Sequence, residues 1–252
     1  MKAQKTVMKT IKARGLVLKE YEAKESDKRL LVLCKEHGRM MIYARGARRP
    51  KSKFMAASQV FTYADFVLAA GRGFYSLAQA EVIESFYGLR TNYDSLAAAH
   101  LIAEVCEKTL LEDIACDDLL QLALKALSYL SKPSIDLSPL QITGVFFTRF
   151  FVYYGLAPET NACTACGEIV EQDAFFAAEG LVCRVCRPGY SIKLSPAAVY
   201  AIRHIVHSDL SKSFLFNAHS SVINELWQVG KLLWDYHFEW RLVSEKYLDS
   251  SL

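Results

Sequence analysis

Four of the chain's seven cysteines fall within one stretch of 24 residues, CTACGEIVEQDAFFAAEGLVCRVC. They form two CxxC pairs, Cys163 with Cys166 and Cys183 with Cys186, with sixteen residues between the pairs. A CxxC turn lets two sulfurs converge at about 2.3 Å from one metal ion, and two such turns complete the tetrahedral shell of Zn²⁺. The spacing therefore predicts a zinc site that folds a segment too short to build its own core.

Two other interpretations of these four thiols are weaker. Unliganded cysteines are usually scattered as small hydrophobic residues and seldom occur as two pairs. Thioredoxin-like redox chemistry needs a single CxxC within a βαβ pattern, which is missing around this segment. Because four thiolates leave no open position on the metal, we expect a structural site rather than a catalytic one. The remaining cysteines are expected to be core residues: Cys34, Cys106 and Cys116.

The start of the chain and its most apolar stretch bear on its location. The first residues, MKAQKTVMKTIKARG, are basic and lack the apolar run of a signal peptide. The stretch Ile142–Tyr154 is too short to cross a bilayer and contains Arg149. With 52% hydrophobic and 23% charged residues, the chain is expected to be a folded cytosolic protein without a membrane partner, and disulfides are rare in that compartment.

Positive charge is concentrated near the start of the chain. The whole chain has a formal charge of +3, but residues 1–55 hold sixteen Lys and Arg against five Asp and Glu, so they carry +11 and the rest carries −8. Within this region, nine residues hold five cations and no acid: Arg45, Arg48, Arg49, Lys51 and Lys53. Such a segment attracts phosphates by releasing condensed counterions, and arginine adds bidentate geometry.

A charge run is more often a solvated surface, and that interpretation remains open for Arg45–Lys53. The concentration of cations in one small region of an otherwise acidic chain favours a nucleic-acid site. Neighbouring aromatic residues that could stack on bases favour it too: Tyr43, Phe54, Phe61, Tyr63, Phe74 and Tyr75. About half of the aromatic residues in strands should face a core, so we assign that role to no single one of them.

The first 85 residues have the pattern of a small β domain. Turn signals such as His37–Arg39 and Gly71–Gly73 separate short apolar runs, which predict five strands: Gly15–Leu18, Arg29–Cys34, Met40–Ala44, Gln59–Leu68 and Phe74–Ile83. Closure would remove the exposed edges of so small a sheet, so we expect a barrel or a curled sheet.

Helical patterns follow the β region. Apolar residues three and four apart predict helices around Ala98–Val105 and Leu119–Leu130. Ser138 is a typical N-cap, Gln141 would complete a capping box, and the aromatic run after it predicts a buried central helix, with a partner-binding face as the lesser alternative. Two further helices are expected from Ser195-Pro196 onward and over Ser220–Trp240.

Catalytic motifs are missing from the sequence. It contains no P-loop, no HExxH and no GxSxG. His204 and His207 could place two imidazoles on one helix face, but no third ligand or base accompanies them, so an ordinary helix surface is the better interpretation. We therefore predict no catalytic residues.

The order of a basic β domain, a helical domain and a four-cysteine insert resembles the RecO family of bacterial recombination mediators. The resemblance covers nearly the whole chain, and the basic segment with YGLAP before the first CxxC is its most specific part. The matching residues are Gly15-Leu16-Val17-Leu18, Asp27, Gly38, Ala44-Arg45-Gly46-Ala47-Arg48-Arg49-Pro50-Lys51-Ser52, Glu81, Tyr154-Gly155-Leu156-Ala157-Pro158 and Leu194-Ser195-Pro196.

The resemblance implies an α+β multidomain protein without enzymatic activity. We expect an OB-fold-like five-stranded barrel over residues 1–85, a helical bundle domain over 86–160 and 190–252, and an inserted zinc ribbon over 161–189. Some members of the family have lost their zinc cysteines, whereas this chain keeps all four. One structural Zn²⁺ is therefore expected at Cys163, Cys166, Cys183 and Cys186.

The resemblance also implies a function in DNA repair. The protein would bind single- and double-stranded DNA, anneal complementary strands, and help RecR to load recombinase onto strands covered by single-strand binding protein. The acidic C-terminal tail of that protein would dock on the helical domain, and the location would be cytoplasmic and nucleoid-associated. The residues expected to contact phosphates are Arg45, Arg48, Arg49, Lys51 and Lys53.

Three other functions remain open at this stage. An OB and zinc-ribbon protein of translation or transcription would share the basic segment but bind RNA. A metallohydrolase would need an open zinc position and a nearby base, which the four-thiol shell argues against. A scaffold would bind protein partners without salt-sensitive affinity for nucleic acid.

Overall fold

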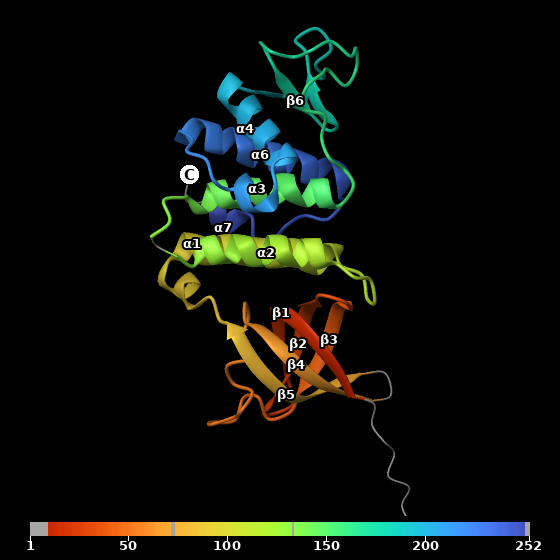
Figure 1. Cartoon of the computed structure of the whole chain (residues 1–252), viewed down its shortest axis with the longest axis vertical. Helices are drawn as coiled ribbons and strands as arrows, with labels where there is room; N and C mark the ends of the chain where they lie inside the picture. The colour runs from red at the N-terminus through yellow and green to blue at the C-terminus, as the bar shows by residue number, and fades with distance from the viewer. Residues whose placement is uncertain (1–9, 72–73, 133, 250–252) are drawn as a thin grey trace, which may run out of the picture. The chain divides into compact units, whose positions relative to one another are not determined.

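The structure is a computed structural model, which describes residues 10–71, 74–132 and 134–249 (Figure 1). The chain forms two compact units: Met1–Tyr87 with Ala103–Leu124, and Gly88–Ile102 with Lys125–Leu252. The four-segment division expected from the sequence stays a prediction. No helix in the described ranges combines the length and the apolar composition needed to cross a bilayer.

Five strands close into a barrel in the first unit, which confirms the expected fold. Their order around the barrel is β1-β2-β3-β5-β4, and antiparallel pairing of β1 with β4 closes it. The pairs are antiparallel except for β3 with β5, which run parallel. The strands are β1 Thr10–Ala23, β2 Asp27–Cys34, β3 Gly38–Ala44, β4 Tyr63–Ala70 and β5 Tyr75–Glu84.

The strand boundaries differ most from the sequence prediction in β1 and at the start of β4. Strand β1 is much longer than Gly15–Leu18, because a bulge after Val17 bends it so that its first half pairs with β4 and its second half with β2. Strand β4 begins at Tyr63 and not at Gln59, because Phe61 has φ +69° and the preceding residues still form turns. Of the predicted Gly71–Gly73 turn, residues 72–73 lie outside the described residues.

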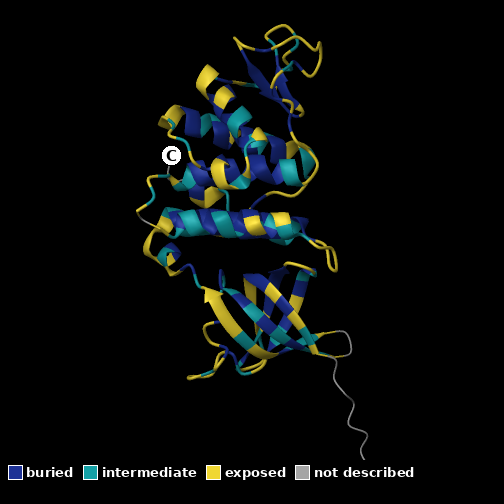
Figure 2. Cartoon of the chain, in the orientation of Figure 1, coloured by how far each residue is buried: buried dark blue, intermediate teal, exposed yellow. Residues whose placement is uncertain are grey.

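The barrel core is made by alternate strand residues, as the banding of buried and exposed positions shows (Figure 2). Side chains point to opposite faces of a strand in turn, so one face of each strand can be apolar. The core includes Val17, Leu30, Val32, Ile42, Phe66 and Leu68.

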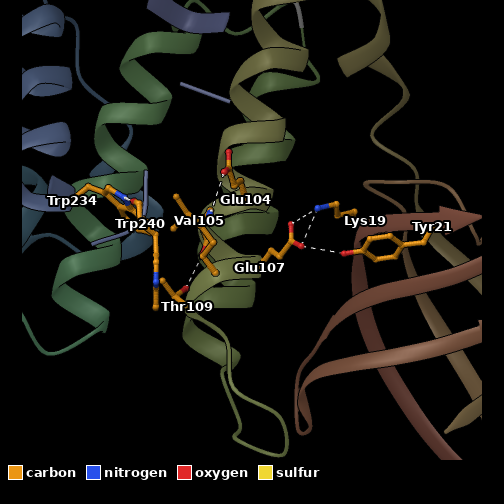
Figure 3. Close-up of polar contacts among 9 residues, drawn as sticks. Lys19, Tyr21, Glu104, Val105, Glu107, Thr109, Trp234 and Trp240 are labelled. Atoms are coloured by element: carbon orange, nitrogen blue, oxygen red, sulfur yellow. Dashed lines mark hydrogen bonds and ion pairs between the residues drawn. The ribbon is translucent and has the colours of Figure 1, made fainter. Parts of the chain in front are cut away.

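The second half of α1 (Tyr93–Thr109) belongs to the same unit as the barrel and is tied to it by polar contacts. Lys19 Nζ on β1 lies 3.1 Å from both carboxylate oxygens of Glu107, and the Tyr21 hydroxyl donates to the same carboxylate over 3.2 Å (Figure 3). Beyond α1, the backbone N–H of Arg39 donates to the carbonyl of Leu111. These contacts hold β1 against α1, and the β2–β3 hairpin against the segment that follows α1.

The second unit is helical, with α3 as its buried centre. Phe146, Phe147, Phe150 and Phe151 are all buried, which confirms the predicted central helix. Phe147 packs edge-on against Trp227 and Trp234 of the long helix α6. The helices of the chain besides α1 are η1 Tyr87–Thr91, α2 Asp117–Leu130, α3 Pro139–Tyr153, α4 Pro196–His207, α5 Leu210–Ser213, α6 Ser220–His237 and α7 Lys246–Asp249, of which α2 is divided between the two units.

The capping box predicted at the start of α3 forms only in part. Ser138 accepts the Gln141 backbone N–H, as expected, over 3.1 Å. The Gln141 side chain does not reach back to Ser138 but donates to the Phe216 carbonyl over 2.8 Å. The Phe216 carbonyl, a partner from a distant part of the chain that no local pattern reveals, therefore replaces one of the two hydrogen bonds of the capping box.

A buried arginine on α3 binds the C-terminal end of α4. Arg149 Nη1 donates to the backbone carbonyls of Ile205, Val206 and Ser208, and its Nη2 donates to the Tyr153 hydroxyl over 2.7 Å. The last carbonyls of a helix lack partners within the helix and carry partial negative charge. The guanidinium therefore satisfies the end of α4 and joins it to α3.

Replacement of Arg149 by Met is expected to destabilise this unit by about 2–4 kcal/mol, since several charge-assisted hydrogen bonds are lost together. All three tryptophans lie in this unit, so tryptophan fluorescence during urea unfolding reports its stability. The same replacement at the exposed Arg241 is the matched control and should change the stability by less than about 0.5 kcal/mol. Equal stabilities of the two variants would contradict this role of Arg149.

Candidate nucleic-acid interface and metal centre

The segment Arg45–Lys53, here called the basic loop, begins the connection between β3 and β4 and has an ordered backbone. Ala47 within the loop and Phe54 directly after it are buried in the barrel core. The Arg48 N–H donates to the Ser26 carbonyl over 3.0 Å, and successive turns are closed by further backbone hydrogen bonds. The loop is therefore attached to the barrel by buried side chains and by backbone hydrogen bonds.

All five cations of the basic loop are exposed, and some have partners. Arg48 lies 2.9 Å from the carboxylate of Glu22, whose side chain is 77% exposed. Arg49 donates to the Ser26 hydroxyl over 3.3 Å, and Lys53 donates to the Ala78 carbonyl over 3.3 Å. Exposed contacts of this kind are weak, and an incoming phosphate can replace them. The structure thus gathers the five predicted residues on one segment, and their contact with DNA stays a prediction.

A buried carboxylate contacts the start of the basic loop. Asp27 is 7% exposed, and it accepts hydrogen bonds from the Tyr43 hydroxyl over 2.5 Å and from the Gly46 backbone N–H over 2.7 Å. The Tyr43 hydrogen bond first, and the Gly46 hydrogen bond second, hold the pKa of the Asp27 carboxyl below its usual value. No local sequence pattern reveals this role of Asp27, because its partners lie on β3 and in the basic loop.

The aromatic residues near the basic loop differ in their exposure to solvent. Phe54 and Phe61 are buried, so they belong to the core and cannot stack on a base from this conformation. Phe74 is 55% exposed, and the three tyrosines of the group are partly buried. Phe74 therefore remains available as a stacking surface.

The two CxxC pairs converge in the second unit, on a small sheet of β6 (Phe175–Ala177), β7 (Gly180–Val182) and β8 (Ile192–Lys193). The four sulfurs lie within 4.8 Å of one another. The sulfurs of Cys166 and Cys183 are 3.9 Å apart, near the edge of about 3.8 Å that a tetrahedron with metal–sulfur bonds of about 2.3 Å requires. The cluster thus has the donor set and the size for one metal ion.

The electrostatics of the cluster also suit a cation. Burial opposes ionisation of the Cys163 thiol, but backbone N–H groups of Cys183, Cys166 and Ala165 point to it and lower its pKa to about 6. Hydrogen bonding among the thiols, first with Cys183 and then with Cys166, raises the pKa of Cys186. Four adjacent thiolates repel one another, so a cation must balance the charge when all four are ionised.

The segment 160–193 around the cluster, here called the ribbon, is held by two side chains of helix α4. Arg203 donates to the carbonyls of Thr160 and Val170, over 2.6 and 3.1 Å. His207 Nε2 lies 3.0 Å from the Thr160 hydroxyl oxygen. His204 instead contacts the Ser208 hydroxyl oxygen and the backbone carbonyl of Lys212. The two histidines thus have separate partners, which agrees with the prediction of an ordinary helix surface.

The other three cysteines are core or partly buried residues. Cys34 and Cys106 are buried, and the half-buried Cys116 thiol lies 3.7 Å from the Cys34 carbonyl oxygen. Burial raises the pKa of Cys34 to about 12 and that of Cys116 to about 11. Such thiols are poor nucleophiles at neutral pH, which supports their interpretation as packing residues.

The fold and the two sites define a class of protein: a closed five-stranded barrel with an ordered basic loop, joined to a helical unit that carries a four-thiol ribbon. Family models agree with both parts. The model for "Recombination protein O N terminal" matches residues 8–86, and that for "Recombination protein O C terminal" matches residues 90–246.

Curated relatives are similar over most of their length. The DNA repair protein RecO of Acetivibrio thermocellus is 36% identical over 228 residues, which is 89% of this chain and 90% of that protein. That of Alkaliphilus metalliredigens is 32% identical over 80% of this chain and 83% of its own. The Bacillus pumilus protein is 29% identical over 95% and 93%. The chain belongs to the RecO family.

Proposed function

We propose that this protein is a DNA-repair mediator that binds single- and double-stranded DNA through the basic loop and anneals complementary strands. The observation that carries the proposal is the set of five exposed cations on an ordered loop rooted in the barrel. The RecO relatives, which are named DNA repair proteins, support it. The chain would act without a catalytic centre, as a recombination mediator.

Annealing is possible for such a surface because two DNA backbones repel each other. A protein that holds both strands against cationic side chains lowers this repulsion, while base pairing supplies the sequence match. The side chains need only neutralise and orient phosphates. Arg48 and Arg49 suit this task best, because a guanidinium can contact one phosphate through two N–H groups.

The proposed partners are those of the RecO family. The protein would work with RecR to load recombinase, and it would bind the acidic C-terminal tail of single-strand binding protein on its helical unit. We further propose that the four thiolates hold one Zn²⁺, which would supply a structural cross-link between the two CxxC turns.

We expect the wild-type protein to bind labelled single-stranded DNA with an affinity that falls steeply with salt. Each phosphate contact contributes about 0.7 to the slope of log affinity against log salt, so five contacts would give a slope of roughly −3.5. Fluorescence anisotropy at several salt concentrations measures it, and strand annealing by fluorescence quenching is the next assay. RNA of the same sequence is the comparison.

Clearly tighter binding of RNA than of DNA would favour the alternative function in translation or transcription. No binding of either at low salt would contradict the proposal and favour a scaffold. Equal or better binding of DNA, together with faster annealing of complementary strands, supports it.

A further inference from the structure

Asp27 and Ser26 lie where the turn between β1 and β2 meets the basic loop. Ser26 accepts the Arg48 backbone N–H through its carbonyl and the Arg49 side chain through its hydroxyl. Asp27 accepts the Gly46 N–H at the start of the loop. Gly46 has φ +67°, a conformation that residues with a side chain rarely adopt, so the loop leaves β3 in a defined direction.

The carboxylate of Asp27 joins the end of a strand to the loop that follows. One oxygen accepts the hydroxyl of Tyr43 on β3, and the other accepts the N–H of Gly46, three residues further along. These two donors, and the Ser26 hydroxyl 3.5 Å from the carboxylate, are neutral groups, so the carboxylate leaves the guanidinium and ammonium groups of the loop unoccupied. Its position at 7% exposure keeps it away from competing water.

The charge of Asp27 also matters for the loop. Five cations within nine residues repel one another, and that repulsion opposes an ordered loop. A buried carboxylate near Arg45 and Lys24 offsets part of it. Glu22 differs from Asp27, because it pairs with Arg48 at the exposed surface, where it competes with a phosphate for the same guanidinium.

From this geometry we infer that Asp27 is a positioning residue for nucleic-acid binding: it holds the basic loop in a preformed arrangement without occupying its cations. A loop that is ordered before binding loses less conformational freedom when it meets DNA. The inference rests on the proposed function of the loop. It extends that function to a residue that is buried and does not itself contact the ligand.

The test combines two measurements on the full chain. Hydrogen exchange with mass spectrometry reports the order of residues 45–53, where the Gly46 amide is the direct probe. Anisotropy of single-stranded DNA at several salt concentrations reports affinity and slope. The variants are Asp27→Ala, which removes both hydrogen bonds, and Tyr43→Phe, which removes one. Asp65→Asn is the matched control, since Asp65 is an exposed barrel carboxylate that pairs with Arg14.

In Asp27→Ala we expect exchange in the loop to rise at least about tenfold, the affinity for single-stranded DNA to fall about tenfold, and the salt slope to become shallower. Tyr43→Phe should show smaller changes in the same direction, and Asp65→Asn should match the wild type. Amides in β1 and β2 should stay protected in every variant.

Three results would overturn the inference. Unchanged exchange in the loop would mean that Asp27 does not hold it. Loss of protection throughout β1 and β2, together with an unchanged salt slope, would mean that Asp27 only stabilises the barrel. Faster loop exchange with wild-type affinity and slope would mean that the preformed order of the loop does not contribute to binding; whether the loop contacts DNA at all is tested separately, by replacing its cations.

Discussion

Replacement of Arg48, Arg49 and Lys51 by Glu is expected to weaken binding of single-stranded DNA at least about 100-fold at ~0.1 M salt. The loss of three phosphate contacts reduces the slope of log affinity against log salt by roughly 2. Over the tenfold interval from ~1 to ~0.1 M salt, the wild-type protein therefore gains about two more decades of affinity than the variant. The three introduced carboxylates add repulsion, so the loss should exceed this value. Fluorescence anisotropy across a salt series measures both quantities.

A matched variant separates the position of these charges from their number. Lys132, Lys212 and Lys246 are exposed residues outside the barrel unit, and their replacement by Glu changes the net charge equally. We expect the slope of this variant to stay near the wild-type value. Equal losses in the two triple variants would show that the overall charge matters and not the basic loop. Wild-type affinity and slope in the first variant would exclude the loop as the DNA site.

Removal of the proposed zinc ion is expected to unfold the ribbon and to leave the barrel intact. Folding and metal binding are coupled in small zinc domains, where the ion contributes about 10–16 kcal/mol at neutral pH. We expect one zinc ion per wild-type chain by elemental analysis. Cys183→Ser should lower the affinity for zinc by far more than the about 10–100-fold loss that follows removal of an outer-shell partner.

The unfolded ribbon should be visible to trypsin. Arg184 lies beside the cluster, is exposed and is followed by Val185, so cleavage after it should accelerate when a strong chelator is added or Cys183 is replaced. Cys116→Ser, which changes a half-buried thiol outside the cluster, should behave as the wild type. A metal-free wild-type protein with a protease-resistant ribbon would contradict the zinc site. DNA affinity should change less than about twofold, because the basic loop lies in the other unit.

Local patterns in the sequence predicted most of the elements. Short apolar runs separated by turn signals predicted the five strands, and their closure into a barrel is confirmed. Ser138 and Ser195 cap α3 and α4 as expected. The predictions were less accurate where tertiary contacts changed a local preference. The helix predicted to end at Trp240 ends at His237, since Phe238 is extended and packs against Trp234.

The sequence by itself determined two sets of candidate functional residues, because each set is close together in the chain. CxxC spacing brings pairs of thiols together through one turn, and the cations of Arg45–Lys53 share one short segment. Only the tertiary structure decided how that basic segment is held. Asp27 and Tyr43 lie sixteen residues apart, at the open end of the β2–β3 hairpin, and they meet only when these two strands pair. The same holds for Arg149, whose partners at the end of α4 lie more than fifty residues away in sequence. Their roles depend on contacts between distant segments, and no local pattern specifies such contacts.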